Sequence, residues 1–156
     1  VSRLTPQGWT HRALPDLTTA KLTDLLTLLA SASATTRFYA QQEILARTAE
    51  ATAAKTAVLP LAKSSTPTLA VRVAALMTYA QLESSAAAVL TLAVEEPLRE
   101  FALRAATDRL PRLKNARLPL EPFTNTLRTG TPRQRAAAAI ALGRLGTPAA
   151  ATALLA

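Results

Sequence analysis

The chain has 156 residues, of which 49% are hydrophobic, only 4% are aromatic and none is cysteine. The absence of cysteine excludes disulfides, thiol nucleophiles, iron–sulfur clusters and c-type haem attachment. Alanine and leucine, the strongest helix formers, dominate the apolar residues, and the residues that favour strands are sparse. The formal net charge is +8, with a net +1 over residues 1–98 and a net +7 over residues 99–156, so the second part can attract an anionic partner.

Residues 1–17 are predicted to be an N-terminal extension that ends a preceding domain. The stretch VSRLTPQGW, which ends at Trp9, is typical of a short strand followed by a turn. We expect Trp9 to pack between that domain and the first helices, in preference to acting as a stacking platform. His11 is the only histidine and lies beside Arg12 in the same segment. A catalytic base or metal ligand needs partners, so we expect a solvated side chain.

The rest of the chain, residues 18–156, predicts helices separated by short turns. The first spans 18–30, where leucines at 22, 25, 26 and 29 follow the spacing of one helical face. A basic linker is expected over 111–118. The remaining predicted helices span 34–48, 51–63, 67–82, 85–94, 97–110, 119–128 and 132–145, and a last one begins at Pro148.

Threonine–proline pairs mark three predicted helix starts. The threonine hydroxyl can accept a hydrogen bond from an unpaired backbone N–H, and proline has no N–H to lose. Gly130 and Gly146 each precede such a threonine, where a glycine would end the previous helix. The pairs are Thr66-Pro67, Thr131-Pro132 and Thr147-Pro148.

An internal repeat runs through the predicted helices. An arginine is followed at i+3 by alanine and at i+7 by an apolar residue, which places these two on one helical face. The intervals between successive arginines are 35, 27 and 36 residues. The four segments are Arg37/Ala40/Ile44, Arg72/Ala75/Tyr79, Arg99/Ala102/Ala106 and Arg135/Ala138/Leu142.

This repeat predicts an all-α fold, an α-solenoid of about four antiparallel helix pairs over residues 18–156. Each pair is too small to bury its own apolar face, so neighbouring pairs stack. A compact bundle is the alternative, but a bundle needs no internal repeat. Because the stretch 149–156 is apolar and a terminal repeat is usually polar, we expect the array to be truncated, with further repeats following.

The four repeat arginines, Arg37, Arg72, Arg99 and Arg135, are expected to be structural. An arginine fork near the start of a helix can tie adjacent repeats together through carboxylates or free carbonyls. The alternative is a ladder of positive charge that faces an anionic ligand.

A second group of basic residues supplies the excess positive charge of the C-terminal half. They are candidates for contacting an anion or a partner, including phosphates, or for forming a solvated face. The absence of aromatic residues between Phe101 and Phe123 gives no support to base stacking. The group comprises Arg104, Arg109, Arg112, Lys114, Arg117, Arg128 and Arg133.

No catalytic, cofactor-binding or metal-binding constellation is recognisable, so we expect no enzyme and no cofactor. Glu95 and Glu96 form the only adjacent acidic pair, and their place before Pro97 favours an interaction with a helix dipole over acid–base catalysis. Tyr39 and Tyr79 are expected to be core residues. The chain also lacks the glycine-rich phosphate loop and the nucleophile elbow.

Residues 131–151, TPRQRAAAAIALGRLGTPAAA, resemble HEAT repeats of the bacterial phycobilisome-lyase type, within the armadillo-like class. The resemblance extends to 131–156, and more weakly to 34–47 and 67–110. The N-terminal third, through VSRLTPQGW and LLTLLASASA, resembles the HEAT region of planctomycete and verrucomicrobial membrane-bound dehydrogenase-like proteins. That resemblance implies a β-propeller before the array, often a cytochrome domain after it, and an extracytoplasmic location.

We therefore expect a non-catalytic scaffold that mediates protein–protein or inter-domain contacts within a larger multidomain protein. Its partner would be a protein or a neighbouring domain, with no membrane insertion by this segment, since no stretch reaches the ~18 apolar residues of a transmembrane helix. The alternative is binding of nucleic acid or another polyanion through the basic C-terminal half. Some HEAT-like DNA glycosylases bind in that way, but no acidic and aromatic pair for such a groove can be placed here.

Overall fold

A computed structural model describes residue 8 and residues 16–108 and 117–155 of the chain. Within these residues the chain forms helices and turns, without strands. Apart from Gly8, the strand and turn predicted over 1–9 lie outside the described residues, as do the histidine at position 11 and most of the predicted linker over 111–118. No helix of the described part is both long enough and apolar enough to span a membrane.

The helices follow the predicted order closely, and short 3₁₀ segments join some of them. The 3₁₀ segments are η1 (Thr48–Glu50), η2 (Thr91–Val94) and η3 (Glu96–Leu98). The α-helices are α1 (Leu22–Leu29), α2 (Ala34–Ala46), α3 (Ala51–Lys63), α4 (Leu69–Leu82), α5 (Ala86–Leu90), α6 (Arg99–Asp108), α7 (Glu121–Thr129), α8 (Pro132–Leu145) and α9 (Pro148–Leu155).

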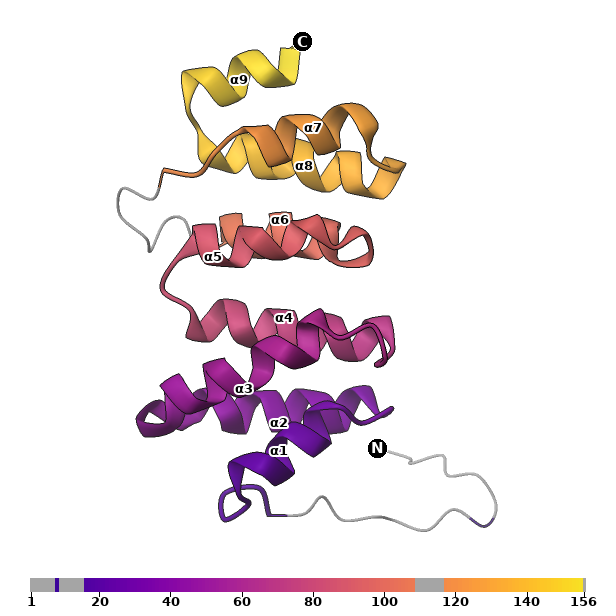
Figure 1. Cartoon of the computed structure of the whole chain (residues 1–156), viewed down its shortest axis with the longest axis vertical. Helices are drawn as coiled ribbons and strands as arrows, with labels where there is room; N and C mark the ends of the chain where they lie inside the picture. Colours follow the sequence, from indigo (N-terminus) through magenta and orange to yellow (C-terminus); the bar gives the residue numbers. More distant parts are fainter. Residues whose placement is uncertain (1–7, 9–15, 109–116, 156) are drawn as a thin grey trace, which may run out of the picture.

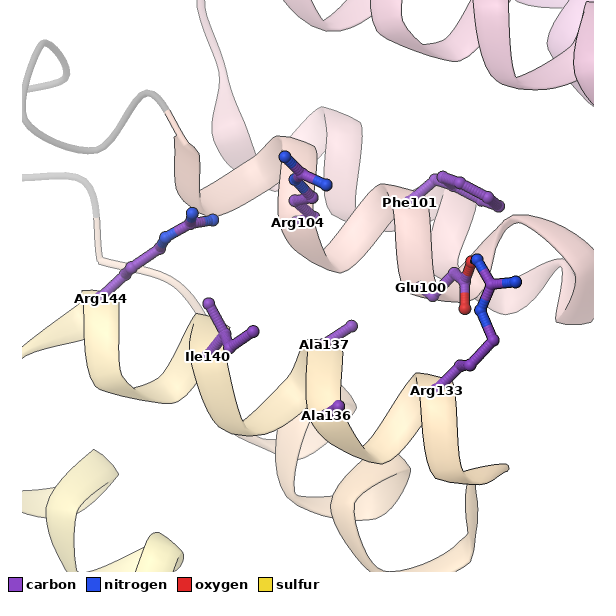
Figure 2. Close-up of a pocket in the computed structure, with 8 residues that line it drawn as sticks. All are labelled: Glu100, Phe101, Arg104, Arg133, Ala136, Ala137, Ile140 and Arg144. Atoms are coloured by element: carbon purple, nitrogen blue, oxygen red, sulfur yellow. The ribbon is translucent and has the colours of Figure 1, made fainter.

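The helices pack in pairs that follow one another along the long axis of the molecule (Figure 1). α1 packs on α2, α3 on α4, α5 on α6 and α7 on α8. We call α2, α4, α6 and α8 the second helices of the pairs. They also form a row of their own, in which α2 packs on α4, α4 on α6 and α6 on α8, with α6 and α8 side by side in Figure 2. This row is the continuous element of the fold.

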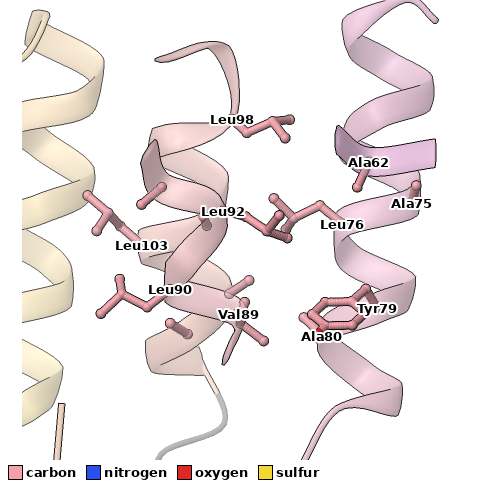
Figure 3. Close-up of a cluster of buried hydrophobic side chains, with 14 of the residues drawn as sticks. Ala62, Ala75, Leu76, Tyr79, Ala80, Val89, Leu90, Leu92, Leu98 and Leu103 are labelled. Atoms are coloured by element: carbon pink, nitrogen blue, oxygen red, sulfur yellow. The ribbon is translucent and has the colours of Figure 1, made fainter. Parts of the chain in front are cut away.

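The core fills the space between successive pairs. Leu76 of α4 points toward Leu92 of the following pair, and both side chains are fully buried (Figure 3). On the other side of that pair, Leu103 is also fully buried. The alanine of each repeat, at positions 40, 75, 102 and 138, is 0% exposed. Because the apolar faces are covered by neighbouring pairs, the layers depend on one another for burial.

The start of α1 differs from the prediction. Helix was expected from residue 18, but α1 begins at Leu22. The Asp16 carboxylate accepts hydrogen bonds from the backbone N–H and the hydroxyl of Thr18, at 3.0 and 2.6 Å. The guanidinium of Arg47, on the far end of α2, donates to the carbonyls of Leu17 and Ala20, both at 2.7 Å. These bonds satisfy the backbone outside a helix, so the helix starts later.

The helix start predicted at Thr66-Pro67 is also wrong. α4 begins at Leu69 after Thr68, whose side chain makes no capping bond, so the pair at 66–67 does not cap the helix. The backbone N–H of Thr66 instead donates to Ser64 Oγ at 3.3 Å within the preceding turn. The predicted helix over 85–94 is confirmed only in part, because it tightens into the 3₁₀ segment η2 after Leu90.

The two C-terminal starts are confirmed. Thr131 and Gln134 form a reciprocal capping box at the start of α8, and Thr147 Oγ1 accepts the backbone N–H of Ala150 at 3.1 Å. Gly146 ends α8 with φ +61°, the left-handed conformation that favours glycine. Gly130 ends α7 as expected, but its backbone is extended, with φ −74°, and not left-handed. Glycine is required at position 130 because a Cβ there would lie too close to the backbone carbonyl oxygen of Thr126.

A polar node joins the second and third pairs. The half-buried Glu83 carboxylate accepts hydrogen bonds from the hydroxyl of Tyr79 at 3.2 Å and from the backbone N–H of Ser85 at 3.0 Å. Lys55 of α3 pairs with it at 3.3 Å. Burial alone would raise the pKa of Glu83, but the hydrogen bonds from Ser85, Lys55 and Tyr79, together with the Lys55 charge, lower it below its ordinary value.

The substitution Gly130→Ala is expected to destabilise the protein by about 1–3 kcal/mol. The new Cβ would lie 2.6 Å from the carbonyl oxygen of Thr126 and 3.0 Å from Cβ of Gln134. The matched control is Gly143→Ala in α8, where a Cβ meets nothing within 4 Å. There alanine should stabilise the helix by about 0.5–1 kcal/mol. Urea unfolding of both variants measures the difference, and equal free energies would contradict the close approach at Gly130.

The Glu83 node should make stability depend on pH. Because its folded pKa is lowered, its contribution is present above the ordinary glutamate pKa and is lost as the pH falls through the folded pKa. We expect the free energy of unfolding of the parent protein to exceed that of Glu83→Gln at about pH 7, and the gap to narrow toward about pH 3. A gap that stays constant over this range would argue against the ionised node.

Candidate functional site

Three repeat arginines close the turn inside their own helix pair. Arg37 Nη1 donates to the carbonyls of Ser31 and Ala32, at 2.7 and 2.8 Å. Arg99 Nε likewise donates to the carbonyl of Ala93 at 3.0 Å. Ser31 and Ala32 lie in the turn after α1, and Ala93 lies in η2. Their backbone carbonyls need hydrogen-bond donors, and an arginine in the first turn of the next helix lies within reach. These bonds hold the two helices of a pair together.

Arg72 is the most buried of the repeat arginines and the one that reaches the next pair. It is 6% exposed. Its Nε donates to the carbonyl of Ala62 at 3.0 Å, and its Nη2 contacts Glu95 Oε2 at 3.3 Å. The contact of Arg72 with Glu95 ties adjacent pairs together, as the sequence predicted. The bonds of Arg37 and Arg99, and that of Arg72 Nε to Ala62, act within a pair.

The fourth repeat departs from this pattern. Arg135 is exposed, and the neighbouring Gln134 is 6% exposed. Gln134 Nε2 donates to the carboxylate of Glu96 at 2.8 Å and to its backbone carbonyl at 3.2 Å. Gln134 therefore links α8 to the preceding pair. Glu95 and Glu96 stand at the start of η3, where a helix-dipole interaction was expected, and their carboxylates are also engaged by Arg72 and Gln134.

A regular surface stripe runs across the second helices. In each repeat the positions −2, +1, +2, +5 and +9 from the repeat arginine are exposed or half-buried. All lie on the second helix except the −2 position of the third repeat, Pro97, which belongs to η3. Because these helices pack in a row and share one register, equivalent positions lie on the same side of the row. We call this surface the second-helix stripe. Its +2 residues are Tyr39, Ala74, Phe101 and Ala137, and its +5 residues are Gln42, Met77, Arg104 and Ile140.

Between α6 and α8 the stripe is hollowed into a groove of about 450 Å³ (Figure 2). Its floor is apolar and is formed by Phe101 with Ala136, Ala137 and Ile140. The Ile140 side chain remains 57% exposed. A large exposed aliphatic residue beside a half-buried aromatic ring offers apolar surface to a ligand.

Charged side chains line the rim of the same groove. Arg133 Nη2 pairs with Glu100 Oε1 at 2.8 Å across the two helices. Arg144 Nη1 pairs with Asp108, which Arg104 Nε also approaches at 3.6 Å. Three guanidinium groups thus share two carboxylates, so the rim keeps a positive balance. Exposed pairs of this kind are weak and exchange with solvent, so they remain available to a ligand.

The predicted basic group is only partly brought together. Arg104 and Arg133 lie in the groove, whereas Arg117 is exposed before α7. Arg128 lines a separate hollow between α7 and α9. The remaining three members, at 109, 112 and 114, lie outside the described residues.

Sequence analysis did not predict several residues in and around the groove, because the repeat pattern covered only positions expected to be structural or buried. These residues are Phe101, Ile140, Arg144 and the carboxylates of Glu100 and Asp108. Extending the same register to +1, +2, +5 and +9 identifies all of them. The core assignment of Tyr39 was wrong, since it is 43% exposed, while Tyr79 is buried as expected.

Within the described residues, no group of three or more histidine, cysteine, aspartate or glutamate side chains could hold a metal ion. Comparison of the chain with protein families, with curated proteins and with solved structures found no match. The chemistry of the groove therefore rests on its own residues: apolar surface, guanidinium donors and a minority of carboxylates.

Substitution of Arg72 tests whether the bonds of the repeat arginines to backbone carbonyls stabilise the fold. Arg72→Ala should destabilise the protein by about 2–3 kcal/mol, because a buried charged donor to a carbonyl is lost. Arg135→Ala, at the equivalent but exposed position, should change stability by less than about 0.5 kcal/mol. Guanidinium chloride unfolding of both variants measures this, and a similar loss for both would contradict the difference in role.

Proposed function

We propose that the chain is a non-catalytic scaffold of HEAT-like type, an α-solenoid whose second helices present a binding face to a protein partner. The observation that carries the proposal is the second-helix stripe, in which the same exposed or half-buried positions recur in four repeats. Repeat arrays use such extended surfaces for binding. The stacked pairs hold the exposed residues at fixed spacing, so a partner meets a surface that is already organised.

The composition of the groove favours a protein partner. Protein interfaces are enriched in aromatic residues and arginine at their centre, and the energetically dominant residues are often of these types. The groove combines Phe101 with the guanidinium groups of Arg104, Arg133 and Arg144 around an apolar floor. In keeping with the resemblance of its sequence, the partner is a protein or a neighbouring domain of a larger multidomain protein outside the cytoplasm.

The alternative, binding of nucleic acid or another polyanion, is less well supported. A phosphate backbone requires cations without competing anions nearby. Here Glu100 and Asp108 stand beside the arginines of the groove, and the stripe on α2 and α4 carries no charged residue. A long anionic polymer would therefore find a positive surface on only half of the row.

Selection from a displayed peptide library tests the proposed function. We expect peptides to be enriched on the intact protein and to lose binding to the variant Ile140→Ser, which changes the exposed groove floor. Binding should be unchanged by Leu155→Ser, an exposed apolar residue of α9 that lies outside the groove. If the enriched peptides lose affinity for the Leu155→Ser variant and keep their affinity for the Ile140→Ser variant, the proposed binding face is wrong.

A further inference from the structure

The chemistry of the second-helix stripe changes along the molecule. On α2 and α4 the stripe consists of apolar, aromatic and uncharged polar residues. On α6 and α8 it carries Arg104, Arg133 and Arg144 together with two carboxylates. The charge is thus confined to one half of the row. A ligand that covers the whole stripe needs two chemically different parts.

The α2–α4 half offers an apolar anchor site. Phe38 and Tyr39 are 54% and 43% exposed, and their rings meet edge to face with centroids 5.7 Å apart. Met77, the +5 residue of α4, is half-buried on the same stripe. Exposed aromatic rings on α2 and a flexible methionine side chain on the neighbouring α4 accommodate bulky apolar groups.

The α6–α8 half offers guanidinium donors to carboxylates. A guanidinium group has five N–H donors, yet Arg133, 80% exposed, uses one of them on Glu100. Arg104 is 66% exposed and stands 3.6 Å from Asp108. Both groups therefore keep donors for a further carboxylate. Ile140 and Phe101 line the same groove (Figure 2).

We infer that the stripe binds a single peptide segment with two parts, a bulky apolar part over α2 and α4 and an acidic part in the groove between α6 and α8. Packed helices lie about 8–10 Å apart, so the row from α2 to α8 spans roughly 25–30 Å. An extended peptide of about eight or nine residues covers this length. The inference rests on the proposed function and specifies the chemistry of its partner.

Fluorescence anisotropy with synthetic peptides tests the inference. Each probe has about a dozen residues, to exceed the span of the row. Two probes join a leucine–phenylalanine–serine block to a glutamate–glycine block, one in each order, so that both directions of binding are tested. In one control probe lysine replaces glutamate, and in another serine replaces the apolar residues. A short DNA duplex serves as the phosphate probe.

At least one two-part probe should bind in the micromolar range, and the lysine and serine probes should bind about tenfold more weakly or worse. The double variant Arg104→Gln/Arg144→Gln should weaken the two-part probe by about tenfold, and Phe38→Ser by about threefold. Arg128→Gln and Leu155→Ser, exposed residues outside the stripe, are the matched controls and should change nothing. Circular dichroism of each variant shows whether its helices are retained.

The outcomes separate the inference from the proposed function. Peptides selected from a library that bind the stripe but are neutral or basic would overturn the inference and leave the proposed function standing. Failure of both two-part probes to bind, or equal binding of the lysine probe, would also overturn it. Tighter binding of the DNA duplex than of either peptide, weakened by the double variant, would overturn both in favour of a polyanion-binding surface.

Discussion

The structure depends on close packing at one small residue in each second helix. The alanine three positions after the repeat arginine is 0% exposed in all four helices, at 40, 75, 102 and 138. Interaxial distance is set by the side chains at the contact, so alanine lets neighbouring helices approach. A larger side chain there would push the layers apart and expose the leucines between them, such as Leu76 and Leu103. Because no pair buries its own face, this contact supports each layer in turn.

Polar contacts fix the helices relative to one another. Arg37 and Arg99 bind backbone carbonyls of the turns inside their own pairs. Two contacts, Arg72 with Glu95 and Gln134 with Glu96, connect one pair to the next. A single register thus assigns one side of each second helix to burial and the other to the stripe. The groove between α6 and α8 follows from this arrangement, since its arginines and its apolar floor occupy the exposed positions of the same repeat.

Local chemistry in the sequence predicted most of the fold. Helix starts at Thr131 and Thr147 were found because their caps act within three residues. The start of α1 was not, because Arg47 binds the carbonyls of Leu17 and Ala20 from about 30 residues away, and no local pattern reports such a bond. Similarly, the repeat predicted that the arginines are structural, but their acceptors depend on packing. Of the groove residues only Arg104 and Arg133 were predicted. The others were missed because they occupy exposed positions, which the periodicity of buried apolar residues does not select.

The central claim is that one partner segment lies across the exposed side of the second helices. The sequence contains a single methionine, Met77 on the α4 stripe, and two isoleucines, Ile140 in the groove and the buried Ile44. Methyl NMR of protein labelled at methionine and isoleucine therefore reports on both halves of the stripe, with Ile44 as internal reference. During titration with the two-part peptide, the account predicts that the Met77 and Ile140 signals shift together and that Ile44 does not. Saturable binding that leaves both stripe methyls unmoved would contradict it.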